Sequence, residues 1–342
     1  MKAAVLAGPR LIKTMELDPP VSTDGSVVVR VTACGICGSD IHYWEAGAGA
    51  DGRPDLVMGH EFAGVIEDAG ARADLRKGDR VTVIPLNPCG ECPACRTGHA
   101  QLCLNGKNRP HIGQNRPGAY AEYIEVRPDM VRSLPGSVSD TAAAMVEPAA
   151  VCLHAVRTSG MRKGDAVLVV GGGTIGLLCA AWARLNGASR VFLSEVSAPR
   201  LDAAARLAMA DEVLDGRDPK VASIIKKATS GGVDIAIDAS ASDAGINTGV
   251  SALGLRGTLV LAGISLRPQS IMTLFLTLKE ATLKTSFGYR IEDFEHSLAA
   301  IAEGQLGVGG LVSRTIGIDE VQHAFEDLHG GASGDVKVII AP

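Results

Sequence analysis

The spacing of hydrophobic residues changes its character near the middle of the chain. Beyond about residue 160, short apolar runs alternate with longer segments whose apolar residues recur at helical spacing. Strands are expected at residues 166–170, 190–196, 212–214, 232–240, 257–263 and 281–287, and helices at about 177–187, 198–209, 219–229 and 243–253. Strands that alternate with helices pack as one parallel sheet covered on both faces. The pattern therefore predicts an α/β, doubly wound Rossmann domain.

The N-terminal part of the chain follows a different pattern. Short apolar runs are separated here by the Gly, Pro and Asp residues that are typical of turns. The runs are SVVVRVTA at 26–33, EFAGVIEDAG at 61–70, DRVTVIPL at 79–86 and YAEYIEV at 120–126. Closely spaced strands of this kind predict a small, mostly antiparallel barrel. We therefore expect two domains, with a cleft between them that holds the reaction.

Composition agrees with two domains and excludes several kinds of partner. The 342 residues are 46% hydrophobic and 21% charged, enough to bury more than one core. No apolar run approaches the length of a membrane span, and the N-terminus lacks the pattern of a signal peptide, so we expect a cytoplasmic protein and no membrane partner. The 33 basic and 38 acidic residues give a net charge of −5 without a basic stripe, which argues against nucleic acid.

A glycine-rich turn follows the first strand of the predicted parallel sheet. Residues 166–176 read AVLVVGGGTIG, a buried-strand run that leads into a helix. Gly171 would permit the tight turn, Gly173 would let a pyrophosphate approach the backbone, and Gly176 would let helix and strand pack closely. Thr174 and Ile175 complete the loop at the helix N-terminus, where the phosphates would lie. This motif predicts a dinucleotide site.

Further residues of that site follow from the sheet. Glu195 ends the second strand about 20 residues after the glycines, where an acid accepts hydrogen bonds from both ribose hydroxyls. A 2′-phosphate would meet this carboxylate with like charge, so NAD is the predicted cofactor. Arg200 would flank the adenine. The nicotinamide would lie off the far strand ends, and the candidate residues there are Ala239, Gly263, Ile264 and Phe287.

Four cysteines cluster in the stretch PCGECPACRTGHAQLC, residues 88–103. Clustered cysteines in an intracellular chain indicate metal binding more than disulfides. Four thiolates would fill a tetrahedral zinc site and leave no position for a substrate, so this zinc is predicted to be structural. An iron–sulfur cluster is the chemical alternative. The predicted ligands are Cys89, Cys92, Cys95 and Cys103.

A second group of metal-binding residue types lies outside that cluster. Cys37 follows a predicted strand and is flanked by glycines, and GHE supplies His60 and Glu61. A thiolate, an imidazole and a carboxylate form the mixed ligand set of a catalytic zinc that keeps one position open. Glu147, held before a proline, is a further candidate ligand from a distant part of the chain.

These residues together resemble a family. CGICGSDIHYW, GHEFAGV, the four-cysteine segment, NRPGAYAEY, VEPAAVCLHA and VGGGTIG occur in the order found in medium-chain, zinc-dependent alcohol dehydrogenases of the sorbitol, butanediol and threonine dehydrogenase branch. The resemblance covers essentially the whole chain. It implies a GroES-like catalytic domain at 1–148 with a structural-zinc lobe at 86–104, a Rossmann domain at 149–287, and a return to the catalytic domain at 288–342. It also implies two zinc ions per chain, and a homotetramer or homodimer joined through the Rossmann sheet.

The resemblance also implies a reaction. The catalytic zinc would be held by Cys37 and His60, with Glu61 as a permanent or transient ligand and Glu147 bound directly or through water. Zinc would lower the pKa of a substrate hydroxyl, and the nicotinamide would accept the hydride. Ser39 and His42 lie two and five residues after Cys37 and match a proton relay in the wider family.

Substrate identity depends on scattered residues. Tyr43 and Tyr289 match pocket positions of the sorbitol branch, but Gly288 stands where sorbitol dehydrogenases typically carry an arginine, and Arg290 could replace it only if it points inward. We therefore expect a small vicinal diol or other secondary alcohol first, a polyol or sugar acid of the sorbitol or idonate type second, and threonine third. A protein that binds zinc and NAD without catalysis is the alternative from another class, and it would predict damage at the metal ligands.

Overall fold

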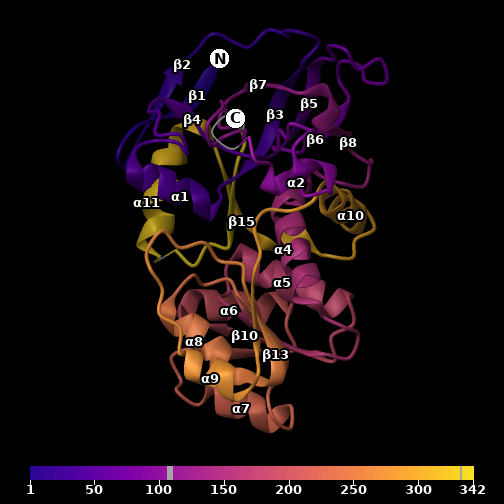
Figure 1. The fold of residues 1–342 in the computed structure, drawn as a ribbon. Coiled ribbons are helices and arrows are strands. Elements are labelled where there is room, and N and C mark those ends of the chain that lie inside the picture. Colours follow the sequence, from indigo (N-terminus) through magenta and orange to yellow (C-terminus); the bar gives the residue numbers. More distant parts are fainter. Residues whose placement is uncertain (106–110, 332) are drawn as a thin grey trace. The chain divides into compact units, whose positions relative to one another are not determined.

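The computed structural model describes residues 1–105, 111–331 and 333–342 (Figure 1). The chain divides into two compact units. The first unit comprises Met1–Glu147, Arg290–Gly331 and Lys337–Pro342, and the second comprises Pro148–Tyr289 and a short segment that ends at Val336. The predicted return to the first domain at residue 288 did not include this short excursion back to the second unit.

The second unit contains the predicted parallel sheet. Its strands are β9 (Ala166–Val170), β10 (Arg190–Glu195), β11 (Glu212–Asp215), β12 (Val233–Asp238), β13 (Leu253–Leu261) and β14 (Thr282–Thr285). They lie in the order β11-β10-β9-β12-β13-β14, and every neighbouring pair is parallel. This is the order of a doubly wound dinucleotide-binding sheet. The Rossmann prediction is confirmed, although β14 stops two residues before Phe287.

Helices cover this sheet and explain why its central strand β9 is apolar throughout. The helices are α4 (Val146–Ser159), α5 (Thr174–Leu185), α6 (Ala198–Leu207), α7 (Val221–Ala228), α8 (Asp243–Ala252) and α9 (Thr273–Leu278). All five residues of β9 are buried. A core cluster joins Leu168 and Ala236 of the sheet to Ile225 of α7 and Val250 of α8. Strands buried on both faces lose the polar alternation of a half-exposed strand.

The first unit is built mainly from antiparallel strands. A mixed sheet has the order β15-β16-β3-β5-β6-β8, and β7 also pairs with β3. Its strands are β3 (Val27–Gly35), β5 (Glu61–Asp68), β6 (Arg80–Val83), β7 (Tyr123–Val126), β8 (Val131–Ser133), β15 (Val312–Ile316) and β16 (Lys337–Ile340). Only the β15–β16 pair among these described strands is parallel. A second, antiparallel sheet joins β2 (Leu11–Glu16), β1 (Lys2–Gly8) and β4 (Leu56–Val57).

Helical segments of the first unit are short apart from two near the C-terminus. The α-helices are α1 (Gly38–Ala46), α2 (Pro93–Arg96), α3 (Asp140–Ala144), α10 (Ile291–Ala302) and α11 (Val321–Gly330). Turns of 3₁₀ helix lie at η1 (Ala100–Leu102), η3 (Pro128–Met130), η4 (Val308–Leu311) and η5 (Ile318–Glu320). None of the helices in the described ranges is both long and apolar enough to cross a membrane.

Strand register brings distant residues to one end of the mixed sheet. Gly35 of β3 lies opposite Glu61 of β5 on one side and opposite Ile339 of β16 on the other. Cys37 lies two residues after the end of β3, and His60 directly precedes β5. Because neighbouring strands lie about 5 Å apart, the side chains at these strand ends can meet.

Candidate functional site

Three predicted metal ligands meet at this end of the sheet. The ligand atoms of Cys37, His60 and Glu61 all lie within 4.8 Å of one another. His60 and Glu61 are buried, whereas Cys37, the residue before α1, is partly exposed. Sulfur, nitrogen and oxygen donors at this spacing fit a zinc ion with one open position.

Glycines leave the room that this arrangement needs. A Cβ atom at Gly35 would overlap the Glu61 carboxylate. Gly59 has φ +97°, and a Cβ there would lie 2.5 Å from the Tyr120 ring. Gly59 therefore sets the direction in which the chain enters His60, since a left-handed φ strongly favours glycine.

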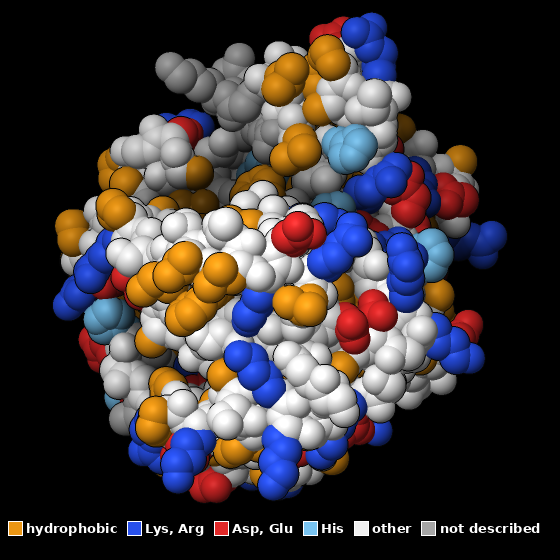
Figure 2. All heavy atoms as spheres, turned by 60° about the horizontal axis from the view of Figure 1, so that its bottom comes forward, with side chains coloured by type: hydrophobic (Ala, Val, Ile, Leu, Met, Phe, Trp, Pro, Cys, Tyr) orange, Lys and Arg blue, Asp and Glu red, His pale blue; other side chains and the backbone are white. Residues whose placement is uncertain are grey.

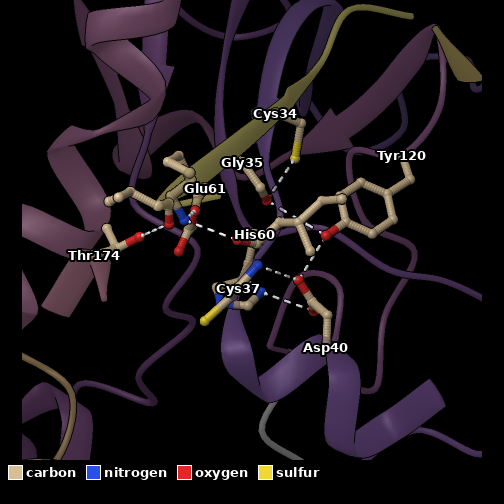
Figure 3. A network of polar contacts seen from close by, with 11 residues as sticks. Cys34, Gly35, Cys37, Asp40, His60, Glu61, Tyr120 and Thr174 are labelled. Atoms are coloured by element: carbon tan, nitrogen blue, oxygen red, sulfur yellow. Dashed lines mark hydrogen bonds and ion pairs between the residues drawn. The ribbon is translucent and has the colours of Figure 1, made fainter. Parts of the chain in front are cut away.

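A buried carboxylate that the sequence analysis did not single out lies behind His60. Asp40 accepts hydrogen bonds from Tyr120 Oη at 2.6 Å and from the Cys37 backbone N–H at 3.0 Å. Its other oxygen lies 3.5 Å from His60 Nδ1 (Figure 3). With Nδ1 facing Asp40, Nε2 is the nitrogen left for a metal, as in carboxylate–histidine–zinc arrangements.

The charges of the site favour a bound cation. Burial would lower the pKa of His60, but the Asp40 carboxylate and the Cys37 thiolate outweigh burial and raise that pKa well above its usual value. The site thus attracts positive charge near the imidazole. Cys34 is not expected to bind the metal. It is buried, and burial raises the pKa of its thiol, which favours the protonated form.

Lys337 is the second residue that the sequence analysis missed. It is 2% exposed, forms an ion pair with Glu61 and donates a hydrogen bond to the Ile36 carbonyl at 2.9 Å. Burial would lower the pKa of Lys337, but Glu61 and Cys37 raise it. Glu147, in the first turn of α4, is also buried and contributes to that rise. The structure does not place a Glu147 oxygen within 4.8 Å of all three ligand atoms.

The predicted relay residues both belong to α1. Ser39 Oγ is buried and has no hydrogen-bond partner among the described residues. A hydroxyl in that state is available to a bound ligand, because buried polar atoms are normally paired. The His42 side chain is 37% exposed, and its Nδ1 lies 4.0 Å from Glu45. The relay assignment of these two residues remains a prediction.

The predicted pocket residues differ in accessibility. Tyr43 of α1 is partly buried, and burial raises the pKa of its hydroxyl. Tyr289 is only 1% exposed, so little of its surface is open to a ligand. Arg290 turns toward the four-cysteine segment, where its Nε donates to the Gly98 carbonyl at 3.0 Å. Because of this contact, the Arg290 guanidinium points away from the role considered for it, which was to replace the arginine that sorbitol dehydrogenases typically carry at the position of Gly288.

The four cysteines form a second candidate metal centre. Their sulfur atoms lie within 4.8 Å of one another, with separations of 3.4 Å for Cys92–Cys95, 3.8 Å for Cys89–Cys95 and 4.0 Å for Cys92–Cys103. A tetrahedron with zinc–sulfur bonds of about 2.3 Å has edges of about 3.8 Å. Backbone N–H groups of Cys95 and Leu104 lower the pKa of Cys92 to about 6. The cage therefore fits a zinc ion held by thiolates.

The glycine loop has the space and the uncapped helix N-terminus that a dinucleotide needs. Gly171 has φ +106°, and a Cβ at Gly176 would overlap the Gly171 carbonyl, so both glycines serve the tight turn. At Gly173 nothing lies within 4 Å of a Cβ position, and this residue precedes α5 without a side-chain cap. The open helix N-terminus suits a phosphate. Thr174 and Ile175 begin α5.

Glu195 lies beside that loop, at the end of β10. One carboxylate oxygen accepts from Gly172 N–H at 2.6 Å, and the other accepts from the N–H groups of Val196 and Ser197 at 2.7 Å. These bonds fix a negative charge next to the glycine turn. Arg200 lies on α6 and is partly exposed.

The other candidate cofactor residues lie beyond the ends of the neighbouring strands. Ala239 follows β12, and its N–H donates to the Val170 carbonyl at 2.8 Å. A Cβ at Gly263 would lie 2.7 Å from Ala241 N, so the turn after β13 requires a residue without a side chain. Ile264 and Phe287 are 52% and 51% exposed, respectively. Large apolar side chains so exposed are available to a ligand or partner.

Fold and site together define a class: a zinc-binding dehydrogenase with a dinucleotide domain. Residues 23–136 match the family described as alcohol dehydrogenase GroES-like domain, and residues 174–303 match the family described as zinc-binding dehydrogenase. A probable D-xylulose reductase A of Emericella nidulans is 32% identical over 94% of this chain and 91% of its own length.

Solved structures agree with these matches. The 2R,3R-butanediol dehydrogenase of Bacillus subtilis is 28% identical, with a TM-score of 0.88 over 100% of this chain and 99% of its own. A putative zinc-binding dehydrogenase of Sinorhizobium meliloti bound to NADP is 30% identical, with a TM-score of 0.89 over the same shares of the two chains.

The chain belongs to the medium-chain, zinc-dependent alcohol dehydrogenase family. It is an oxidoreductase that acts on the CH–OH group of a polyol or other secondary alcohol and uses zinc and a nicotinamide cofactor. The family resemblance seen in the motifs is thereby confirmed. A non-catalytic zinc protein was predicted to have lost metal ligands such as Cys37 or His60. Both residues are present and lie together.

Proposed function

We propose that this enzyme oxidises a secondary hydroxyl that is flanked by another hydroxyl, with NAD as the acceptor. The observation that carries the proposal is the convergence of Cys37, His60 and Glu61 within 4.8 Å in a protein that also holds an open glycine loop. When bound, zinc would polarise the substrate hydroxyl and the nicotinamide would accept the hydride. Each of the two units thus supplies one half of the chemistry.

The chain's own residues have separate tasks in this proposal. Cys37 and His60 hold the metal, Glu61 is a permanent or transient third ligand, and Glu147 lies farther out. Ser39, whose Oγ has no partner among the described residues, would hydrogen-bond the substrate hydroxyl and relay its proton by giving up its own, and His42, with a side chain 37% exposed, would pass a proton on to solvent. Cys89, Cys92, Cys95 and Cys103 hold a second, structural zinc, which gives two ions per chain.

The preference for NAD over NADP rests on Glu195. Its carboxylate is fixed at the end of β10 beside Gly172, where it would accept the ribose hydroxyls and repel a 2′-phosphate. The Sinorhizobium meliloti relative is described as bound to NADP, so the family does not decide the question. The charge of Glu195 supports NAD in this chain.

Two features bear on the size of the substrate. Gly288 lacks a side chain, and Arg290 is engaged by Gly98, which leaves a polyol without the arginine contact of the sorbitol branch. A small vicinal diol therefore comes first, in line with the butanediol dehydrogenase relative. The D-xylulose reductase relatives favour a longer polyol as the second candidate. Sugar acids of the idonate type and threonine are the remaining alternatives.

A rate comparison tests the proposal. We would measure kcat/KM with NAD and with NADP for both enantiomers of butane-2,3-diol, propane-1,2-diol, xylitol, sorbitol, idonate and threonine. A small diol with NAD should dominate. A dominant xylitol rate would transfer the proposal to polyols, and a preference for NADP would refute the role of Glu195. Cys37→Ala should bind NAD normally and lose turnover by at least about a thousandfold; retained activity would refute the zinc assignment.

We also propose that the chain forms a homodimer or homotetramer in the cytoplasm. β14 ends the order of the parallel sheet, and three of its four residues are exposed. Large exposed apolar residues occur on the same strand and on α9, namely Leu283, Leu274, Phe275 and Leu278. Figure 2 shows hydrophobic side chains gathered on the face viewed from the side of α7 and α9. An exposed strand edge beside apolar side chains favours pairing with a second copy.

A further inference from the structure

Lys337 occupies an unusual environment for a lysine. The side chain is 2% exposed, and it begins β16, all four residues of which are buried. Its ammonium group reaches two elements of the metal site, the Glu61 carboxylate and the carbonyl of Ile36, the residue before Cys37. Burying a charge in this way is costly unless the charge is paired and hydrogen-bonded. Both conditions are met by contacts with the metal site itself.

The ammonium group also limits where the Glu61 carboxylate can lie. A Cβ at Gly35 would overlap Glu61 Oε2 and would come within 3.3 Å of Lys337 Nζ, so the carboxylate is confined between this backbone and the lysine. Lys337 engages Oε2. The other carboxylate oxygen is the one left to serve as a metal ligand.

The residue before Lys337 reaches the dinucleotide loop. The Val336 carbonyl accepts a hydrogen bond from Thr174 Oγ1 at 2.5 Å, drawn as a dashed line from Thr174 in Figure 3. Thr174 is the first residue of α5 and follows Gly173, where the loop is open. Val336 belongs to the second unit and Lys337 to the first. One peptide bond therefore joins a contact of the nucleotide loop to a contact of a metal ligand.

We propose that Lys337 is a positioning residue that sets the geometry of Glu61 at the metal, and that the Val336–Lys337 peptide makes this geometry respond to the nucleotide. The inference rests on the proposed zinc and NAD sites. A pyrophosphate at the N-terminus of α5 restricts Thr174, which restricts Val336 and thereby Lys337. By linkage, metal binding and nucleotide binding must then strengthen or weaken each other by the same factor.

Substitution of Lys337 tests the positioning role without an activity assay. Lys337→Met keeps the aliphatic stem and removes the charge, Lys337→Arg keeps a charge, and the exposed Lys77→Met serves as a matched control. We would measure metal affinity by chelator competition and record the visible spectrum of cobalt(II) at the site. The Met variant should lose about 10- to 100-fold in affinity and change the spectrum, as expected for a partner of a metal ligand, whereas Arg should recover both. An unchanged Met variant would overturn the proposal.

A double variant guards against misfolding, since Lys337→Met leaves Glu61 buried without its partner. Glu61→Gln combined with Lys337→Met removes both charges. If Lys337 acts through Glu61, adding Lys337→Met to Glu61→Gln should change the metal affinity by less than about twofold. A further tenfold loss would show that Lys337 acts elsewhere and would overturn the assignment.

Nucleotide addition tests the coupling. Saturating NAD should shift the cobalt spectrum of the parent and of Thr174→Ser, which keeps the hydroxyl, but not of Thr174→Val at an NAD concentration that also saturates that variant. The same shift in Thr174→Val would overturn the coupling. A parent enzyme that binds no metal at Cys37 and His60 would instead refute the proposed function, so the two failures are distinguishable.

Discussion

Asp40 determines which nitrogen of His60 can face a metal ion. Its carboxylate lies 3.5 Å from Nδ1 and is held in place by Tyr120 Oη and the Cys37 N–H. The residue is completely buried, and the bonds from Tyr120 and Cys37 replace the hydration of one of its two oxygens. A carboxylate in this position orients the imidazole and increases its basicity as a ligand. Asp40 thus contributes to metal binding without being a ligand itself.

Asp40→Asn isolates this contribution, because it keeps the shape of the side chain and removes the charge. Metal affinity at the Cys37 site should fall about tenfold or more, and kcat should fall with it. Chelator competition on the purified protein measures the first effect. Asp51→Asn, at an exposed carboxylate paired with Arg53, is the control and should behave as the parent. Native affinity in Asp40→Asn would show that its carboxylate does not orient His60.

Asp40 and Lys337 were not recognised as site residues from the sequence, and the physical reason is the same for both. Cys37, His60 and Glu61 belong to residue types that bind metals, so their chemistry is visible without coordinates. Asp40 lies in the same motif, but its partner Tyr120 is 80 positions away, and Lys337 is 276 positions from Glu61. An Asp or a Lys in a single sequence is more often a surface residue. Only the pairing of β3 with β5 and β16 shows that these two are buried at the site.

Among the elements, the four-cysteine segment has little regular secondary structure. Its two helical pieces, α2 and η1, have four and three residues, and α2 buries none of them. Arg290 adds one hydrogen bond from the residue before α10 to Gly98. Helices this short are unstable alone. A metal ion bound by the four thiolates would therefore supply most of the order of this segment.

Cys92→Ser should lower stability more than it lowers the chemistry at Cys37. We expect the melting temperature to fall by more than about 5 °C, because a lost zinc ligand removes folding free energy. Zinc content should drop by one ion per chain. Differential scanning calorimetry and metal analysis give both numbers, and Glu91→Gln, at an exposed neighbour, is the control. A variant that melts like the parent but has no turnover would mean that the two zinc roles are reversed.

The predicted elements were most accurate where burial is most complete. The parallel strands appear as apolar runs because helices cover both faces, and β9 to β13 were all located from sequence. The helices α10 and α11 were not predicted, although their buried residues, such as Phe294 with Leu298 and Val321 with Phe325, follow helical spacing. The pairing of β16 with β3 leaves no periodic signal, because it joins strands from opposite ends of the chain.

On the scale of the whole molecule, the order of segments cannot be read from hydrophobic spacing. The first unit is assembled from three separate stretches, and the chain crosses between units at Val336 and Lys337. Periodicity reports how each stretch is buried but not which other stretch buries it. The family resemblance predicted that the chain returns to the first domain near its C-terminus. Only the structure shows that it crosses once more between Val336 and Lys337, and the coupling inferred for Lys337 depends on this crossing.

The exposed edge strand of the parallel sheet, β14, bears on how copies of the protein assemble. Leu283 lies on β14, is 43% exposed, and is close in sequence to the exposed Leu278 of α9. A lysine on an edge strand opposes edge-to-edge pairing, because it would bring like charges together across a twofold axis. Leu283→Lys should therefore shift a dimer or tetramer toward monomer, by about tenfold or more in dissociation constant.

Light scattering across a dilution series measures this shift. Val21→Lys makes the same change at a residue of the first unit that is 72% exposed, and it should leave the mass unchanged. A monomeric parent would refute the oligomer outright. A parent oligomer that survives Leu283→Lys would place the interface away from β14, and the exposed apolar residues of α9 would then have to meet another partner. If Leu283→Lys dissociates the protein and zinc content stays at two ions per chain, assembly through the sheet edge is independent of both metal centres.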